Sequence, residues 1–263
     1  MHSDLKSYAR LLYSIHMNSE KAFFNWSGGK DSALALHKLR EVGSYEIACL
    51  LTTVNGYFDR VSMHGVRTGL LEQQAEAIGI PLKKVILPEM PDMETYERIM
   101  GEELLKLKAG GVSNAVFGDI FLEDLRKYRE DKLAQVGLKC IFPLWKVPTH
   151  ELIREFIDLG FKAITVCVND KILDRSYVGR TIDSKFVSDL PEKVDPCGEN
   201  GEFHSFVYDG PIFKKPVEFG IGEIVYKKYK RPGEVSKSDD AETLNSDDPF
   251  DSGFWYCDLT LRP

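Results

Sequence analysis

Short apolar runs alternate with helical stretches along the first half of this 263-residue chain, and this alternation restricts the fold more than any other feature. Each run is four to eight residues long and precedes a stretch whose apolar side chains recur at helical spacing. Gly43 and Gly79 end two of these stretches, as glycine commonly does at helix C-termini. The pattern predicts an α/β fold with a doubly wound parallel sheet, in which ligands bind beyond the carboxyl ends of the strands. The predicted strands are residues 22–26, 47–54, 84–87 and 114–118.

The character of the chain changes after about residue 145. We therefore expect two domains, a first domain over residues 1–145 and a smaller α/β domain over residues 146–263. Residues 232–252 hold many acids and few large apolar side chains, which predicts a mobile loop. The strands predicted in the second domain are residues 163–168, 203–207, 221–226 and 254–261.

Several absences predict a cytoplasmic protein that does not enter a membrane. No run of 18 apolar residues is present, which argues against a membrane-spanning helix. The first 20 residues lack the long apolar block of a secretory signal. The five cysteines are scattered without a CxxC pair, as expected in a reducing compartment.

The charge is unevenly distributed and argues against a nucleic-acid partner. The net charge is −7, from 34 basic and 41 acidic residues. Residues 231–252 carry −5 of this, with seven acids and two bases, so the rest of the chain carries only −2. Nucleic-acid binders usually show a basic surplus, because neutralising phosphates supplies much of their affinity.

The segment Ser27-Gly28-Gly29-Lys30-Asp31-Ser32 lies where the first predicted strand turns into a helix. Glycines let the backbone approach an anion, and the helix N-terminus adds partial positive charge. The lysine adds a full charge and the two serines add hydroxyl donors, so we interpret this loop as a phosphate-binding site. An aspartate in an anion site implies a shared cation, and we expect Mg²⁺ there. The loop is neither a Walker A motif nor a GxGxxG motif.

This hexapeptide resembles the PP-loop of the ATP pyrophosphatases, which share a Rossmann-like sheet. Further segments are similar to the diphthine–ammonia ligase family, in the same order and spacing over about residues 21–226. The most specific of them is the Cys-Gly-Glu-x-Gly-Glu run within residues 195–203. The other matching segments are residues 73–82, 117–120, 143–145 and 209–213.

The resemblance implies a ligase that uses ATP to adenylate a carboxylate, releases pyrophosphate, and then forms an amide with ammonia. Free ammonium is the expected donor, because the chain does not begin with a nucleophilic cysteine. One candidate acceptor is diphthine on elongation factor 2. The chain departs from the family pattern at residues 124–126 and 203–205, and these departures favour another acceptor as an alternative.

Roles for individual residues follow from their positions in the chain and, for the adenine contacts, from the resemblance. The loop residues Ser27 to Ser32 would bind ATP, with Lys30 on its β- and γ-phosphates and Asp31 on Mg²⁺. Asp119 is a second candidate for Mg²⁺ and catalysis, although a helix N-cap is an equal alternative. Gly118 would let the nucleotide approach closely. Residues at the end of the second strand would bind adenine through backbone groups, and these are Thr52, Thr53 and Val54.

Residues on the acceptor side are harder to assign. Glu199 and Glu202 are candidates for catalysis, through acceptor recognition or proton transfer from the attacking amine. A zinc site through Cys197 and His204 is an alternative, but further ligands at a recognisable spacing are missing. The weaker candidates for the substrate side are His64, Arg126, Glu130 and His204.

Two other functional classes share the same nucleotide site. An RNA-modifying PP-loop enzyme is one, against which the near-neutral charge outside the acidic segment and the missing CxxC argue. A non-catalytic nucleotide sensor is the other, against which the intact loop and Asp119 argue. A homo-oligomer is compatible with either class and with the ligase.

Overall fold

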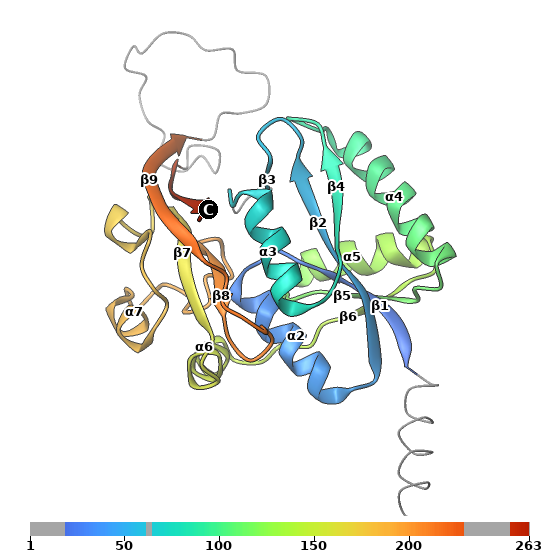
Figure 1. Ribbon diagram of the computed structural model, residues 1–263, viewed down its shortest axis with the longest axis horizontal. Helices are drawn as coiled ribbons and strands as arrows, with labels where there is room; N and C mark the ends of the chain where they lie inside the picture. The colour runs from blue at the N-terminus through green and yellow to red at the C-terminus, as the bar shows by residue number, and fades with distance from the viewer. Residues whose placement is uncertain (1–18, 62–64, 229–252, 263) are drawn as a thin grey trace, which may run out of the picture.

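The computed structural model describes residues 19–61, 65–228 and 253–262 and contains two sheets (Figure 1). The predicted acidic loop at 232–252 and the candidate His64 lie outside the described residues. The larger sheet has the strand order β4-β2-β1-β5-β6, and all of these strands run parallel. A two-residue strand, β3, pairs antiparallel with the end of β2. These strands are β1 (Glu20–Asn25), β2 (Tyr45–Asn55), β3 (Arg60–Val61), β4 (Leu82–Leu87), β5 (Asn114–Val116) and β6 (Lys139–Ile141).

Helices cover both faces of this sheet, as in a doubly wound fold. Two helices pack on one face within the larger apolar cluster, where Leu36 and Leu70 are fully buried. The other two pack on the opposite face, with Leu107 and Leu133 in a second cluster. The first pair is α2 (Lys30–Val42) and α3 (Thr68–Ile78), and the second pair is α4 (Met93–Ala109) and α5 (Glu123–Gln135).

The chain order of the strands reverses direction between β1 and β5, which are neighbours in the middle of the sheet. In open α/β sheets a crevice forms at this switch point, outside the carboxyl ends of the strands. The loops that follow β1 and β5 therefore meet here. They carry the phosphate-loop segment and the Gly118-Asp119 pair.

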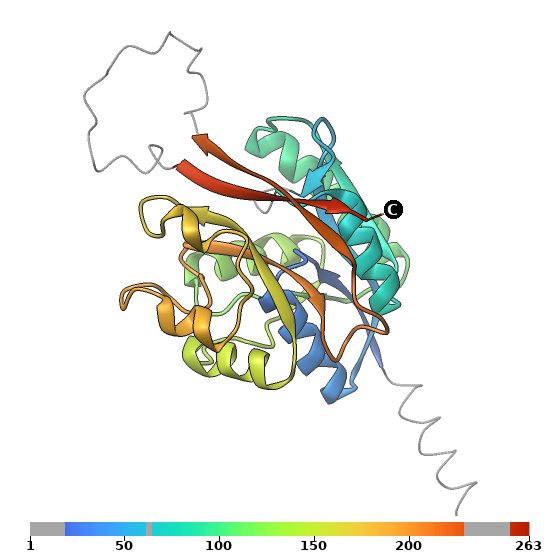
Figure 2. The ribbon, with the colours of Figure 1, turned by 60° about the vertical axis from the view of Figure 1, so that its left-hand side comes forward.

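The second sheet is antiparallel, with the strand order β8-β7-β10-β9. It lies beside the first sheet, with α2 and α3 between them (Figure 2). Helix α2 contacts β8 and helix α3 contacts β10, and one apolar cluster runs from Phe24 on β1 to Phe206 on β8. The elements are α6 (Thr149–Asp158), β7 (Lys162–Asn169), α7 (Ser184–Asp189), β8 (Phe203–Asp209), β9 (Phe219–Lys228) and β10 (Gly253–Leu261).

The predicted α/β fold class is confirmed. The two sheets are built from residues on either side of residue 145, while the division into two domains stays a prediction. Strands β3 and β6 and helices α6 and α7 were not expected from the sequence. Among the described residues, no helix is long and apolar enough to cross a membrane.

Candidate active site

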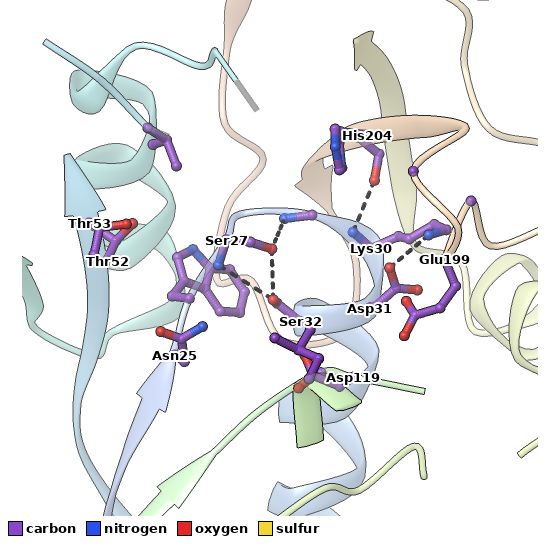
Figure 3. A pocket seen from close by; sticks show the side chains of 18 of the residues that line it. Asn25, Ser27, Lys30, Asp31, Ser32, Thr52, Thr53, Asp119, Glu199 and His204 are labelled. Atoms are coloured by element: carbon purple, nitrogen blue, oxygen red, sulfur yellow. Dashed lines mark hydrogen bonds and ion pairs between the residues drawn. The ribbon is translucent and has the colours of Figure 1, made fainter. Parts of the chain in front are cut away.

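The phosphate-loop segment forms a tight turn between β1 and α2. Strand β1 ends at Asn25, and α2 begins at Lys30 with Gly29 as its N-cap. Gly29 has no side chain to cap the helix, and the N–H of Lys30 donates to Ser205 Oγ, so the other N–H groups of the first turn are available for an anion. The Ser27 and Ser32 hydroxyl oxygens lie 2.8 Å apart, and the Gly29 N–H donates to Ser27 Oγ at 3.2 Å (Figure 3).

Gln74 on α3 holds this turn from behind and was not among the predicted site residues. Its amide donates to the carbonyl oxygens of Gly28 at 3.0 Å and Val207 at 2.6 Å, and accepts from Trp26 Nε1 at 2.9 Å. The Gly28 carbonyl also accepts from the Val207 N–H at 2.9 Å. Gly28 has φ +79°, and a Cβ there would lie 2.8 Å from Gln74 Oε1, so only glycine fits.

The turn opens into a cavity of about 650 Å³ that both halves of the chain line. Figure 3 shows the loop, the end of β2, Asp119, and residues of the 197–205 segment facing this space. Most of the predicted site residues are brought together here. They are Ser27, Gly29, Lys30, Asp31, Ser32, Thr52, Thr53, Gly118, Asp119, Glu199 and His204.

Lys30 is buried at the base of the cavity, with 3% of its surface exposed. Its Nζ donates to Asp31 Oδ2 at 2.7 Å and to the Cys197 carbonyl. Burial opposes the charge on Lys30, but the groups around it, with Asp31 foremost and Glu199 among them, together keep the pKa of Lys30 above its ordinary value. Lys30 is therefore a fixed positive charge next to the anion-binding turn.

Asp119 is paired with Arg129, a residue of α5 that the sequence analysis did not single out. Arg129 Nε lies 2.6 Å from Asp119 Oδ2, and the guanidinium packs 4.4 Å from the centre of the Phe117 ring. Burial raises the pKa of Asp119, with Arg129 acting against the rise. This carboxylate is thus balanced by an arginine in the absence of any ligand.

Glu199 and His204 bring two titratable groups from the second half of the chain. Glu199 Oε1 accepts a hydrogen bond from the Ile120 N–H at 2.8 Å, which ties its segment to the loop after β5. Burial raises the pKa of Glu199 to about 7. Burial, with Lys30 nearby, lowers the pKa of His204 to about 4, so this imidazole is neutral at physiological pH.

Five predicted site residues in the described part of the chain do not line the cavity. Gly28 and Val54 are buried beside it. Glu202 is buried and accepts from the N–H groups of Asp195 and Asn200. Arg126 and Glu130 pair with each other at 2.8 Å on α5, and Arg126 packs on the Phe142 and Trp145 rings.

The cavity also contains residues that sequence reasoning missed. Asn25 and Trp26 directly precede the loop motif, so their position in the chain could have indicated them. Tyr96 and Arg129 lie on α4 and α5, and Ser205 lies on β8. Only the packing of distant segments brings these three to the cavity.

A metal ion would depend on ligands from outside the protein. Within the described ranges, no group of three or more His, Cys, Asp or Glu side chains is arranged to hold one, so the zinc alternative gains no support. Asp31 and Asp119 both line the cavity. Mg²⁺ is commonly held by one or two carboxylates together with substrate phosphates and water, so this pair fits Mg²⁺ only with a phosphate ligand present.

Comparison with known families gives matches over most of the chain. A family described as the diphthamide synthase N-terminal domain matches residues 20–140, and one described as the diphthamide synthase C-terminal domain matches residues 148–237. The chain is also similar to curated proteins named diphthine–ammonia ligase. The human protein is 27% identical over 231 residues, which cover 76% of this chain and 82% of the relative.

Two other relatives carry the same name. The Schizosaccharomyces pombe protein is 27% identical over 231 residues, and the match covers 78% of this chain but only 38% of that longer relative. The zebrafish protein, from Danio rerio, is 25% identical over 226 residues, covering 76% of this chain and 86% of the relative. The resemblance predicted from the motifs is thus confirmed, and this chain belongs to the diphthamide synthase family.

Proposed function

We propose that this protein is an ATP-dependent ligase that adenylates a carboxylate and converts it to an amide with ammonia. One observation carries the proposal. The phosphate-binding turn of the first half and the Glu199 segment of the second half line a single cavity. A nucleotide and an acceptor could therefore react there, and the names of the relatives support this class of reaction.

In the first step the acceptor carboxylate attacks the α-phosphorus of ATP, and pyrophosphate leaves. Lys30 and the N-terminus of α2 stabilise the charge that builds on the departing pyrophosphate. Preorganised donors of this kind typically contribute about 3–4 kcal/mol each to the transition state. Thr52 and Thr53, at the end of β2, lie on the wall where adenine would bind.

Magnesium would be held by Asp31 and Asp119 together with the phosphates, and it would neutralise part of their charge. Each of these carboxylates is paired with a cation of the protein, Lys30 and Arg129 respectively. The chain thus keeps both carboxylates charge-balanced before a nucleotide binds.

In the second step ammonia attacks the acyl carbon, AMP leaves, and one proton must be removed from the nitrogen. We assign this proton to Glu199, whose carboxyl has a pKa of about 7. A base whose pKa lies near the working pH is well matched to proton transfer, and general base catalysis typically contributes about 10²–10⁴-fold. His204 is a poor alternative, since its lowered pKa makes it a weak base.

For the acceptor we propose diphthine on elongation factor 2, with ammonium as nitrogen donor and the cytoplasm as location. All five cysteines are free, which supports a reducing compartment. The test incubates the protein with Mg-ATP, ammonium and diphthine-bearing elongation factor 2, and measures AMP, pyrophosphate and the mass of the acceptor. Amidation with equal release of AMP is expected. Formation of ADP would contradict the adenylating mechanism, whereas AMP release with a different carboxylate would reject only the acceptor.

A further inference from the structure

Ser205 connects the second sheet to the first turn of α2. It lies on β8, is 3% exposed, and lines the cavity. Its Oγ accepts the N–H of Lys30 at 3.1 Å, across 175 positions of the chain. The register between β7 and β8 shifts between Thr165 and Cys167, opposite Ser205 and His204. Both of these neighbours on β8 line the cavity.

The proton of this hydroxyl has no acceptor among the residues that the structure describes. A serine hydroxyl has one proton to donate and two lone pairs that accept. The Lys30 N–H occupies one lone pair of the Ser205 oxygen, so the hydroxyl proton is still free to be donated. Because a buried donor without an acceptor is costly, an oxygen atom in the cavity is the natural partner.

The surroundings of Ser205 select an anionic oxygen. The Lys30 ammonium and the N-terminus of α2 lie on the same wall, and both favour negative charge. Two carboxylates that line the cavity have partners of their own in the chain, Asp31 in the Lys30 ammonium and Glu199 in the Ile120 N–H. A phosphate oxygen meets these conditions.

We propose that Ser205 donates its hydroxyl proton to the pyrophosphate part of bound ATP, and to free pyrophosphate after the first step. The inference rests on the proposed nucleotide site. In this arrangement Ser205, which lies in the second half of the chain and outside the loop motif, completes the phosphate site. The donor would act beside Lys30, whose own N–H it fixes.

The test is calorimetric titration of the full-length protein with inorganic pyrophosphate, ATP and adenosine, at one fixed magnesium concentration. Ser205→Ala is expected to weaken binding of pyrophosphate and ATP about 10- to 100-fold, the usual effect of losing a hydrogen bond to a charged group. Adenosine binding is expected to stay unchanged. Ser205→Thr keeps a hydroxyl and should recover most of the affinity. Ser188→Ala removes an exposed hydroxyl on α7 and serves as the control.

Unchanged pyrophosphate affinity in Ser205→Ala would overturn the inference. An equal loss for adenosine would also overturn it, because it would indicate a distorted cavity, and so would a full loss in Ser205→Thr. Failure of the unaltered protein to bind pyrophosphate and ATP would reject the nucleotide site itself. A selective loss in Ser205→Ala supports the inference even if no carboxylate is ever amidated.

Discussion

At the scale of single residues, the surroundings of a side chain in the structure distinguish two glutamates that look alike in the sequence. Glu199 and Glu202 stand three positions apart in one motif. Glu202 is buried against backbone N–H groups and holds the turn that carries the motif. Glu199 faces the cavity with a raised pKa. The structure therefore favours Glu199 over Glu202 as the proton acceptor that we propose.

Replacing Glu199 should change the pH dependence of the reaction. With a pKa of about 7, Glu199 is a base only in its deprotonated form. Ammonium cannot attack until it loses a proton, so kcat/KM is calculated for unprotonated ammonia, and on this basis it should rise with pH and level off above about 7. Glu199→Gln should abolish this rise and lower kcat about 10²–10⁴-fold. Initial rates between pH 5.5 and 9 provide the check. A rise that persists in Glu199→Gln would assign the titration to another group.

The same pKa has a consequence for folding. A carboxyl whose folded-state pKa lies above its ordinary 4.5 binds its proton more tightly when folded. Its contribution to stability is therefore lost as pH rises from about 4.5 to 7. Glu199→Gln should be more stable than the unaltered protein at pH 8, and the gain should disappear at pH 4. Urea denaturation at the two pH values tests this.

Gln74 should be important for stability although it does not contact the proposed nucleotide. Gln74→Ala leaves Trp26 Nε1 without its acceptor and removes a donor from the Gly28 and Val207 carbonyls. Each buried group left unsatisfied costs about 1–3 kcal/mol, so we expect a loss of at least about 2 kcal/mol in the free energy of unfolding. Gln73→Ala is a matched control on the same helix, because Gln73 is half-buried and outside this network. Equal losses in the two variants would contradict the assignment.

At the scale of elements, two arginines of helix α5 stand close together in the sequence but have different surroundings in the structure. Arg129 reaches Asp119 at the cavity, while Arg126 packs outside it on aromatic rings and pairs with Glu130. The sequence predicted Arg126, and not Arg129, as a weaker candidate for the substrate side. It could not determine which face of the helix turns toward the cavity, since the charges on α5 leave little apolar periodicity from which to read its orientation.

Paired substitutions on α5 test this orientation. Arg129→Gln leaves Asp119 partly buried without its cation and should cost about 1–3 kcal/mol of stability. Adding Asp119→Asn removes the uncompensated charge and should restore most of the loss. Arg126→Gln breaks an exposed ion pair and the contacts with the Phe142 and Trp145 rings, and because these groups are partly exposed it should cost only about 1 kcal/mol. Urea denaturation measures the stability of all three variants. A larger loss in Arg126→Gln than in Arg129→Gln would mean that Arg126, and not Arg129, faces the cavity.

More generally, the sequence predicted those helices and strands that have a clear hydrophobic pattern within their own residues. The run Ile47–Val54 is apolar except for Thr52 and Thr53, and it becomes the most buried part of β2. Strand β3 was missed because two residues are too few to show a period, and β6 was missed although it is as long as β5, which was predicted. Gln74 and Ser205 were missed as site residues for a different reason. Their partners lie 46 and 175 positions away in the chain, and only tertiary packing brings them together.

At the scale of the whole molecule, the two sheets share one apolar core although the sequence suggested two domains. The larger cluster joins Phe24 of β1 to Phe206 and Val207 of β8 through helix α2. Between the sheets, Lys38 pairs with Glu155 at 2.5 Å, and Arg67 pairs with Asp258 at 2.6 Å. The cavity depends on this junction, because its walls come from both halves.

A shared core predicts that the two sheets unfold together. Native-state hydrogen exchange should give the amides of β1 and β7 the same opening free energy, with the same dependence on denaturant. Val207→Ala removes two buried methyl groups from β8 and should lower stability by about 2 kcal/mol. In a cooperative molecule this loss appears equally in β1, on the other sheet. If the loss were confined to β7 and β8, the halves would be independent domains. The cavity would then form only when two separately folded parts dock. Nucleotide binding would stabilise both sheets only in the docked state.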